Sequence, residues 1–266
     1  MKNRLVRKIN EAHGKKRKLF CAYLTLGFPS ISYTEKLIVA LVKVGADIIE
    51  LGFPFSDPLA DGPTIQFSSE YALRHGVKFD RAFQLVSRLR KRGVQVPILF
   101  FSYYNPIYQK GYKRFTQALK KSGFDGVIIP DLPPEEDREL PRLLRSKGLS
   151  LVYLVTPTST SKRIKMITQK SSGFIYLVSL KGVTGVRKKL DANVVFHVCR
   201  IRKATRKAVL IGFGVSNPKQ AHRMSRISDG VIVGSAFIEA IRRARGRLGP
   251  VVNFAKRMVS ATKGSK

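Results

Sequence analysis

The sequence is short of cysteine, of long apolar runs and of acidic residues, and each scarcity excludes a class of protein. Its two cysteines, Cys21 and Cys199, form no Cys-x-x-Cys pair, which argues against a disulfide framework and favours a reducing compartment, the cytoplasm. No apolar run approaches the roughly 18–20 residues that span a membrane, so we expect no membrane association. The charged start, residues 1–8, leads into no apolar stretch, so we expect no secretory signal.

Acidic residues are heavily outnumbered. The chain has 50 Lys and Arg against 17 Asp and Glu, which gives a formal net charge of +33. From residue 140 onward there are 27 basic residues and three acidic ones. Such an excess predicts non-specific attraction to polyanions, including nucleic acid, that weakens steeply with salt and shows no sequence preference. The charge says nothing about the fold.

Apolar residues are plentiful, and their spacing predicts the architecture. Of 266 residues, 44% are hydrophobic, which excludes disorder as the main state. The length fits one large domain or two small ones, and because no linker divides the chain we predict a single domain over residues 1–266. Short and mostly continuous apolar runs predict strands buried on both faces, at residues 20–26, 47–52, 97–102, 126–129, 149–155, 174–179, 208–212 and 230–234.

Stretches with helical spacing separate these runs, at residues 34–44, 81–92, 115–122, 135–147 and 217–226. Four of them end in a glycine at the expected position, namely Gly45, Gly93, Gly123 and Gly148. Eight strands alternating with helices predict a (β/α)8 TIM barrel, with a doubly wound open sheet as the alternative. Residues 1–13 would form an extra N-terminal helix before the first strand, and residues 250–262 a closing helix.

Two acidic residues stand at the end of the second predicted strand, where barrel enzymes keep their reacting groups. Glu50 lies inside the apolar strand, where a carboxylate is costly unless it is paired or functional, and burial would raise its pKa. Asp61 lies in the following loop, which holds three prolines and two acids. A raised pKa suits a proton-transfer group. Taken alone, Glu50 fits a structural pairing with a backbone group or a lysine equally well.

Glycines cluster after the last three predicted strands, at residues 182–185, 212–214 and 234. Glycine lets backbone N–H groups approach an anion, and a helix starting at Ser235 would point its positive end at the same place. Loops after strands seven and eight usually form the phosphate site of this barrel class. Each glycine alone is explained by a tight turn, but three consecutive loops converging on one spot predict a phosphate site.

Signals for other chemistries are absent from the sequence. The four histidines are scattered, and none is spaced with Cys or a carboxylate for metal binding. The P-loop, His-Glu-x-x-His and Gly-x-Ser-x-Gly motifs do not occur, and Gly212-Phe213-Gly214 lacks the third glycine of a dinucleotide site. We therefore predict a barrel enzyme without a metal, with two carboxylates on one side of its mouth and a phosphate site on the other.

The longest motif covers residues 49–66, which read Ile-Glu-Leu-Gly-Phe-Pro-Phe-Ser-Asp-Pro-Leu-Ala-Asp-Gly-Pro-Thr-Ile-Gln. This very specific loop motif resembles the tryptophan synthase alpha chain family. Shorter matches follow in order over residues 20–240: Leu26-Gly27 with Pro29, Tyr103-Tyr104-Asn105-Pro106, Pro130-Asp131-Leu132-Pro133, Gly182-Val183-Thr184-Gly185, Gly212-Phe213-Gly214 and Gly234-Ser235-Ala236. The strongly basic charge and the basic residues of the sixth loop (Lys181, Arg187, Lys188, Lys189) depart from the family.

The resemblance implies a lyase that cleaves indole-3-glycerol phosphate to indole and glyceraldehyde 3-phosphate. By family position Glu50 would be the general acid and base for indole C3 and the side-chain hydroxyl, and Asp61 would bind the indole N–H. The phosphate would lie on Gly185, Gly214, Gly234 and Ser235, with Tyr176 nearby. The indole pocket would be formed by Tyr23, Phe101, Tyr103, Ile128, Leu154 and Phe213.

The resemblance also implies a partner and two lids. Segments 53–62 and 179–193 would close over the substrate, with Pro54, Asp57 and Thr184 in the lid and partner contacts. The partner would be a beta subunit that carries pyridoxal phosphate, receives indole and forms an alpha-beta-beta-alpha heterotetramer, while this chain needs no cofactor. A barrel retained mainly as an allosteric partner of the beta subunit is the alternative. A further alternative, another phosphate-binding barrel, does not predict the proline-aspartate loop.

Overall fold

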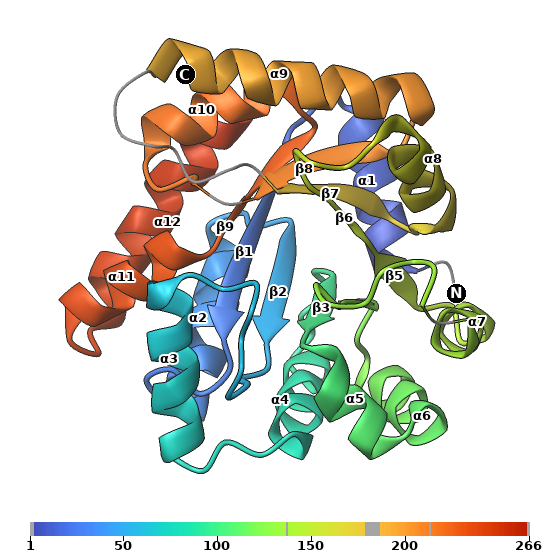
Figure 1. Cartoon of the computed structure of the whole chain (residues 1–266). Coiled ribbons are helices and arrows are strands. Elements are labelled where there is room, and N and C mark those ends of the chain that lie inside the picture. Colours follow the sequence, from blue (N-terminus) through green and yellow to red (C-terminus); the bar gives the residue numbers. More distant parts are fainter. Residues whose placement is uncertain (1–2, 137, 179–186, 213, 265–266) are drawn as a thin grey trace.

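Parallel strands form a barrel with helices around it (Figure 1). The computed structural model describes residues 3–136, 138–178, 187–212 and 214–264. The strand order is β5-β4-β3-β2-β1-β9-β8-β7-β6. The two end strands, β5 and β6, flank Tyr153 and are successive pieces of one barrel strand, so nine labelled strands fill eight barrel positions. They are β1 (Leu19–Thr25), β2 (Ile48–Gly52), β3 (Ile98–Phe101), β4 (Gly126–Ile128), β5 (Ser150–Val152), β6 (Leu154–Val155), β7 (Phe174–Val178), β8 (Ala208–Gly212) and β9 (Gly230–Val233).

The predicted (β/α)8 barrel is therefore confirmed, and each predicted apolar run contains a strand. The runs are continuous because the strands are covered on both sides: by helices outside and by one another's side chains inside. Strands β1 to β4 are buried at every position. The predicted helices are α1 (Arg4–Gly14), α2 (Ile31–Lys43), α4 (Asp80–Lys91), α6 (Tyr112–Ser122), α7 (Glu139–Ser146), α10 (Pro218–Ile227), α11 (Ser235–Ala244) and α12 (Leu248–Lys263).

Four further helices escaped the sequence analysis: α3 (Pro63–Arg74), α5 (Tyr104–Lys110), α8 (Ser161–Lys170) and α9 (Arg187–Ala204). Several predicted helix starts were also wrong: α2 begins at Ile31 and not at residue 34, α6 at Tyr112 and not at residue 115, and α7 at Glu139 and not at residue 135. Pro141 explains the later start of α7, because proline is tolerated in the first turn of a helix but clashes with the preceding turn in its interior. The four predicted terminal glycines all have positive φ, between 67° and 96°, as helix ends require.

Three aspartates organise the N-terminal end of the barrel, where the strands begin. Asp47, Asp125 and Asp229 each stand just before a strand and accept the backbone N–H of a neighbouring strand segment, with N–O distances of 2.8–3.0 Å. Each is also ion-paired to at least one Lys or Arg. Three of the chain's few acids are therefore explained by strand pairing rather than by catalysis.

Helix α1 covers the same N-terminal end. The Asn3 side chain caps α1 by accepting from Leu5 N, and it donates to the carbonyls of Asp125 and Gly148 at 2.6 and 2.8 Å. Leu5 is fully buried against Gly173. The predicted extra helix is thus confirmed from Arg4 onward. None of the helices in the described segments is both long and apolar enough to cross a bilayer.

Candidate active site

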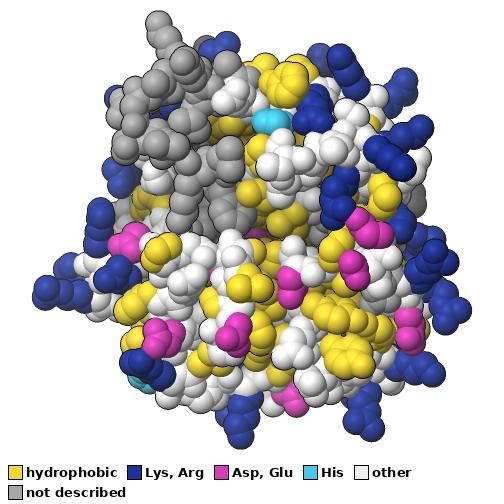
Figure 2. Space-filling view, viewed as in Figure 1, with side chains coloured by type: hydrophobic (Ala, Val, Ile, Leu, Met, Phe, Trp, Pro, Cys, Tyr) yellow, Lys and Arg dark blue, Asp and Glu magenta, His cyan; other side chains and the backbone are white. Residues whose placement is uncertain are grey.

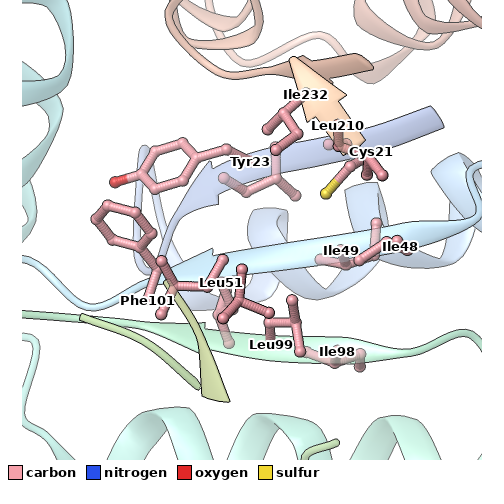
Figure 3. Close-up of a cluster of buried hydrophobic side chains, with 14 of the residues drawn as sticks. Cys21, Tyr23, Ile48, Ile49, Leu51, Ile98, Leu99, Phe101, Leu210 and Ile232 are labelled. Atoms are coloured by element: carbon pink, nitrogen blue, oxygen red, sulfur yellow. The ribbon is translucent and has the colours of Figure 1, made fainter. Parts of the chain in front are cut away.

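A cavity of about 240 Å³ opens at the C-terminal end of the strands. Side chains from β1, β3, β7 and β9 line it, together with the starts of α3 and α11. Figure 3 shows the rings of Tyr23 and Phe101 beside each other near this end, with Cys21 farther back on the strand of Tyr23. The two rings meet edge to face at 5.4 Å between centroids. The lining residues are Tyr23, Asp61, Gly62, Thr64, Ile65, Phe101, Tyr176, Gly214, Val215, Ile232, Gly234 and Ser235.

Asp61 is the carboxylate of this cavity. Its Oδ2 accepts a hydrogen bond of 3.0 Å from the Tyr103 hydroxyl, and the same hydroxyl accepts from the backbone N–H of Ala60. The ring of Phe55 stacks on that of Tyr103 at 5.2 Å. Tyr103 therefore holds the loop that carries Asp61 in place from both sides. Burial raises the pKa of Asp61 to about 6, and the bond from Tyr103 opposes that rise.

Glu50 lies deeper, inside the barrel, and is fully buried. Its Oε1 accepts the thiol proton of Cys21 at 3.4 Å between sulfur and oxygen, and its Oε2 has no hydrogen-bond partner in the described chain. Burial raises the pKa of Glu50 to about 8, and the bond from Cys21 opposes that rise. No lysine or arginine bonds to it among the described residues, so the structural pairing considered from the sequence is not what is observed.

Two tyrosines that line the cavity lie close to Glu50, which does not line it. Tyr23 lies beside Glu50 in the strand register, and Tyr176 is close enough for the Glu50 charge to raise its pKa further, beyond the effect of burial. Both rings lie over glycines. A methyl group on Gly52 would stand 2.3 Å from the Tyr23 hydroxyl, and one on Gly212 would stand 2.4 Å from the Tyr176 ring. These two glycines therefore create the room in which the tyrosines form the cavity floor.

The opposite side of the cavity suits an anion. Gly234 is the N-cap of α11 and has no side-chain cap among the described residues, so the first N–H groups of α11 face outward with the positive end of the helix dipole. Gly62 starts α3 in the same way, again without a side-chain cap. The Thr64 hydroxyl joins the two helices by donating to Glu239 on α11 at 3.3 Å.

Several known proteins similar to this chain carry the same name. The model of the tryptophan synthase alpha chain family matches residues 9–263. An alpha chain from Dehalococcoides mccartyi is 45% identical over 228 residues, covering 86% of this chain and 89% of the relative. One from a Thermoanaerobacter species is 40% identical over 261 residues, 98% of both chains. The chain belongs to the tryptophan synthase alpha chain family.

Solved structures agree with this membership. The alpha subunit of tryptophan synthase from Legionella pneumophila superimposes with a TM-score of 0.92 at 34% identity, covering 99% of this chain and all of the other. A chain of tryptophan synthase from M. tuberculosis gives 0.89 at 30% identity, covering 98% and 99%. This alpha chain is thus an enzyme, and its activity is the alpha-subunit reaction of tryptophan biosynthesis.

Besides Glu50 and the loop after β2, the residues predicted for the site of this alpha chain fall into four groups. Asp61, Tyr23, Phe101, Tyr176, Gly214, Gly234 and Ser235 line the cavity. Ile128 on β4 and Leu154 on β6 do not line it. Tyr103 reaches the cavity only through Asp61. Gly185, Thr184, Phe213 and most of the predicted lid 179–193 lie outside the described residues.

The loop after β2 holds two of the residues predicted for lid and partner contacts. Pro54 is buried and Asp57 is exposed, so a contact role suits Asp57 and the neighbouring Leu59, whose side chain is 91% exposed. Leu59 was not predicted from the sequence. Cys21 was not predicted as a site residue either, although alternation along β1 places residues 21 and 23 on the same side. Among the described residues, no group of three or more His, Cys, Asp or Glu is placed to hold a metal ion.

Proposed function

We propose that this alpha chain cleaves indole-3-glycerol phosphate in the cavity above Tyr23 and Tyr176, with Glu50 and Asp61 as the two catalytic carboxyl groups. The observation that carries the proposal is the difference between their environments. With pKa values of about 8 and about 6, Glu50 is mostly protonated at neutral pH and Asp61 is mostly ionised. One group can then donate a proton while the other stabilises a positive charge.

The charge states match a retro-aldol cleavage. Protonated Glu50 gives its proton to C3 of the indole ring, which makes the ring cationic, and ionised Asp61 stabilises that charge through the ring N–H. The resulting Glu50 carboxylate takes the proton of the side-chain hydroxyl, the carbon–carbon bond breaks, and its electrons return to the ring. Indole and glyceraldehyde 3-phosphate leave, and Glu50 is protonated again for the next turnover.

The remaining contacts orient the substrate. The indole ring would lie against Tyr23 and Phe101, which line the cavity side by side, and the phosphate would accept hydrogen bonds from N–H groups at the start of α11 and in the Gly214 turn. Because Glu50 does not line the cavity and is bonded to Cys21, its carboxyl group must turn from Cys21 toward the cavity to reach indole C3. The buried Oε2 has no hydrogen-bond partner in the described chain. The movement therefore breaks no hydrogen bond at this atom, which lowers its free-energy cost.

The test is release of indole from indole-3-glycerol phosphate by the parent, Glu50→Gln and Asp61→Asn. A proton-transfer group of this kind contributes about 10²–10⁴-fold in rate, so each variant should lose at least about a hundredfold in kcat. Glu136→Gln, which changes an exposed acid that follows the β4 strand, is the matched control and should keep parental activity. Parental turnover by Glu50→Gln would refute the assignment. Slow parental turnover that beta subunit does not raise would favour the allosteric-partner alternative.

We also propose that the chain works in the cytoplasm with a beta subunit as an alpha-beta-beta-alpha assembly, and that the beta subunit holds pyridoxal phosphate. Support comes from similar chains found in structures titled tryptophan synthase, one of them described as aminoacrylate-bound. On this chain the exposed Leu59 and Tyr108, at 91% and 61% exposure, offer apolar contacts near the mouth. Aromatic residues such as Tyr108 are enriched in protein interfaces.

Leu59→Asp tests this contact surface. The variant should bind beta subunit at least about tenfold more weakly, because about 1.4 kcal/mol of lost burial gives that factor. Val195→Asp, an exposed apolar position on α9, is the control. Equal binding by the parent and both variants would exclude Leu59 from the interface. Indole release measured without beta subunit would show whether each variant keeps its own catalytic activity.

A further inference from the structure

Basic residues accumulate at the N-terminal end of the barrel for a topological reason. Seven helices of the described chain, α2, α4, α6, α7, α8, α9 and α10, each run into the next barrel strand. Since all strands are parallel, all seven helices end at the N-terminal end. Every one has Lys or Arg in its last turn, which is favourable beside the negative end of a helix dipole. The barrel thereby gathers these separate cations on one face.

The acids at this end do not neutralise that face. Glu11, Asp47, Asp125 and Asp229 are already ion-paired with Lys8, Arg17, Arg90 and Arg202, among others. Arg7, Lys43 and Arg206 are exposed and have no ion-pair partner among the described residues. On the different face shown in Figure 2, Lys and Arg lie mainly around the edge, and several acids lie nearer the middle.

Two grooves run beside α1 on this face. The first, of about 590 Å³, lies between α1 and the ends of α2 and α4, and Arg7 and Lys43 line it. The second, of about 710 Å³, lies between α1 and the end of α9, and Arg206 and Lys207 line it. Arg17 lines both grooves, so its positive charge is shared by the two grooves at the end of α1.

We propose that this N-terminal face of the barrel is a docking surface for the phosphate backbone of a nucleic acid duplex, held along the two grooves beside α1. Several separate, exposed cations match a polymer with repeated phosphates better than a single small anion. Single strands are usually held by base stacking on aromatic side chains, and the exposed aromatics of the described chain, Phe67, Tyr108 and Phe196, are not on this face.

A lipid surface is the weaker fit. Membrane-surface binding requires apolar side chains that enter the lipid boundary, and on α1 Val6 is the one exposed large apolar residue, at 38% exposure. The proposed surface also lies at the opposite end of the barrel from the catalytic cavity. Duplex binding and cleavage of indole-3-glycerol phosphate should therefore occur together without competition.

The test compares two variants with the same change in net charge. The groove variant combines Arg7→Glu, Lys43→Glu and Arg206→Glu. The control combines Arg81→Glu, Arg114→Glu and Lys162→Glu, which are exposed cations in the first turns of α4, α6 and α8, at the other end of the helices. A triple variant with Gln at the groove positions covers the case in which charge reversal disturbs folding. Indole release should be parental in all of them.

Binding of a short duplex DNA is measured by titration over a series of salt concentrations. The groove variant should bind at least about tenfold more weakly than the parent, and its slope of log affinity against log salt should fall by about 3, since each lost phosphate contact removes about 0.9. The control should bind within about threefold of the parent. Equal losses in both variants, or no binding by the parent, would overturn the proposal.

Three further measurements distinguish a duplex on this face from a single strand, a lipid surface and binding at the catalytic mouth. Single-stranded RNA with the same number of phosphates should bind more weakly than the duplex, and preference for the RNA would overturn the assignment to a duplex. Vesicles containing phosphatidylserine should compete poorly, and their binding in place of DNA would assign the face to a membrane. Competitive inhibition of indole release by the duplex would place it at the mouth and would also refute the proposal.

Discussion

The thiol of Cys21 lies 3.4 Å from Oε1 of Glu50, and both side chains are fully buried inside the barrel. Burial and the adjacent Glu50 raise the pKa of the Cys21 thiol well above its usual value, so the thiol stays protonated and acts as the donor. This bond stabilises the ionised form of Glu50. Cys21 therefore helps to set the pH at which the proposed catalytic acid gives up its proton.

Replacing Cys21 should move the alkaline limb of the pH profile, the pH range in which kcat/KM falls as Glu50 loses its proton. Cys21→Val removes the donor, and a hydrogen bond of about 0.5–1.5 kcal/mol corresponds to roughly half to one unit of pKa. The alkaline limb of kcat/KM should shift upward by that amount. Cys21→Ser restores a donor and should bring the limb back toward the parental value. An unchanged profile in Cys21→Val would show that the thiol only fills space.

The parental profile itself should be bell-shaped. Asp61 must be ionised, so kcat/KM should fall as the pH drops through about 6, and Glu50 must be protonated, so kcat/KM should fall as the pH rises through about 8. Asp61→Asn should abolish the acid limb while the alkaline limb remains in the residual activity. A profile in which Asp61→Asn retains both limbs would assign the acid limb to another group.

Glu50 should also reduce stability at high pH. Its pKa is raised from 4.5 to about 8 in the folded chain, so the folded state holds a proton that the unfolded state has lost. Stability therefore declines as the pH rises from about 4.5 to about 8. Glu50→Gln should unfold in urea with about 2–4 kcal/mol more stability than the parent at about pH 9. The two should converge near about pH 5, and a constant difference at all pH values would contradict the burial argument.

The glycines under the two tyrosines should be needed for substrate binding. Gly212→Ala would place a methyl group 2.4 Å from the Tyr176 ring and force the ring toward the cavity. Overpacking of this kind costs about 1–3 kcal/mol, so KM should rise about tenfold or more. Gly249→Ala adds the same methyl group in α12, where nothing lies within 4 Å, and should leave KM unchanged. A parental KM for Gly212→Ala would mean that Tyr176 moves away from the cavity without loss.

Much of the fold could be predicted from local patterns. The eight apolar runs identified the strands because a strand covered on both sides needs apolar residues at successive positions. Helix ends at Gly45, Gly93, Gly123 and Gly148 were evident because left-handed backbone favours glycine. Helix α3 was missed because the catalytic loop motif continues into it without a change in composition. The start of α7 was misplaced because the limit set by Pro141 was not considered.

The candidate site, like the fold, could be predicted only in part from the sequence. The sequence by itself determined which chemistry is present: a buried acid in a strand, a second acid in a stiff loop, glycines after the last strands, and an excess of cations. Only the tertiary structure decided which of these groups meet, because closure of the barrel places residues far apart in the chain on one wall or on opposite walls. It brought Tyr103 to Asp61 and Cys21 to Glu50, and it gathered cations from the ends of many helices on one face. No local pattern contains that information, since it depends on how distant strands pair.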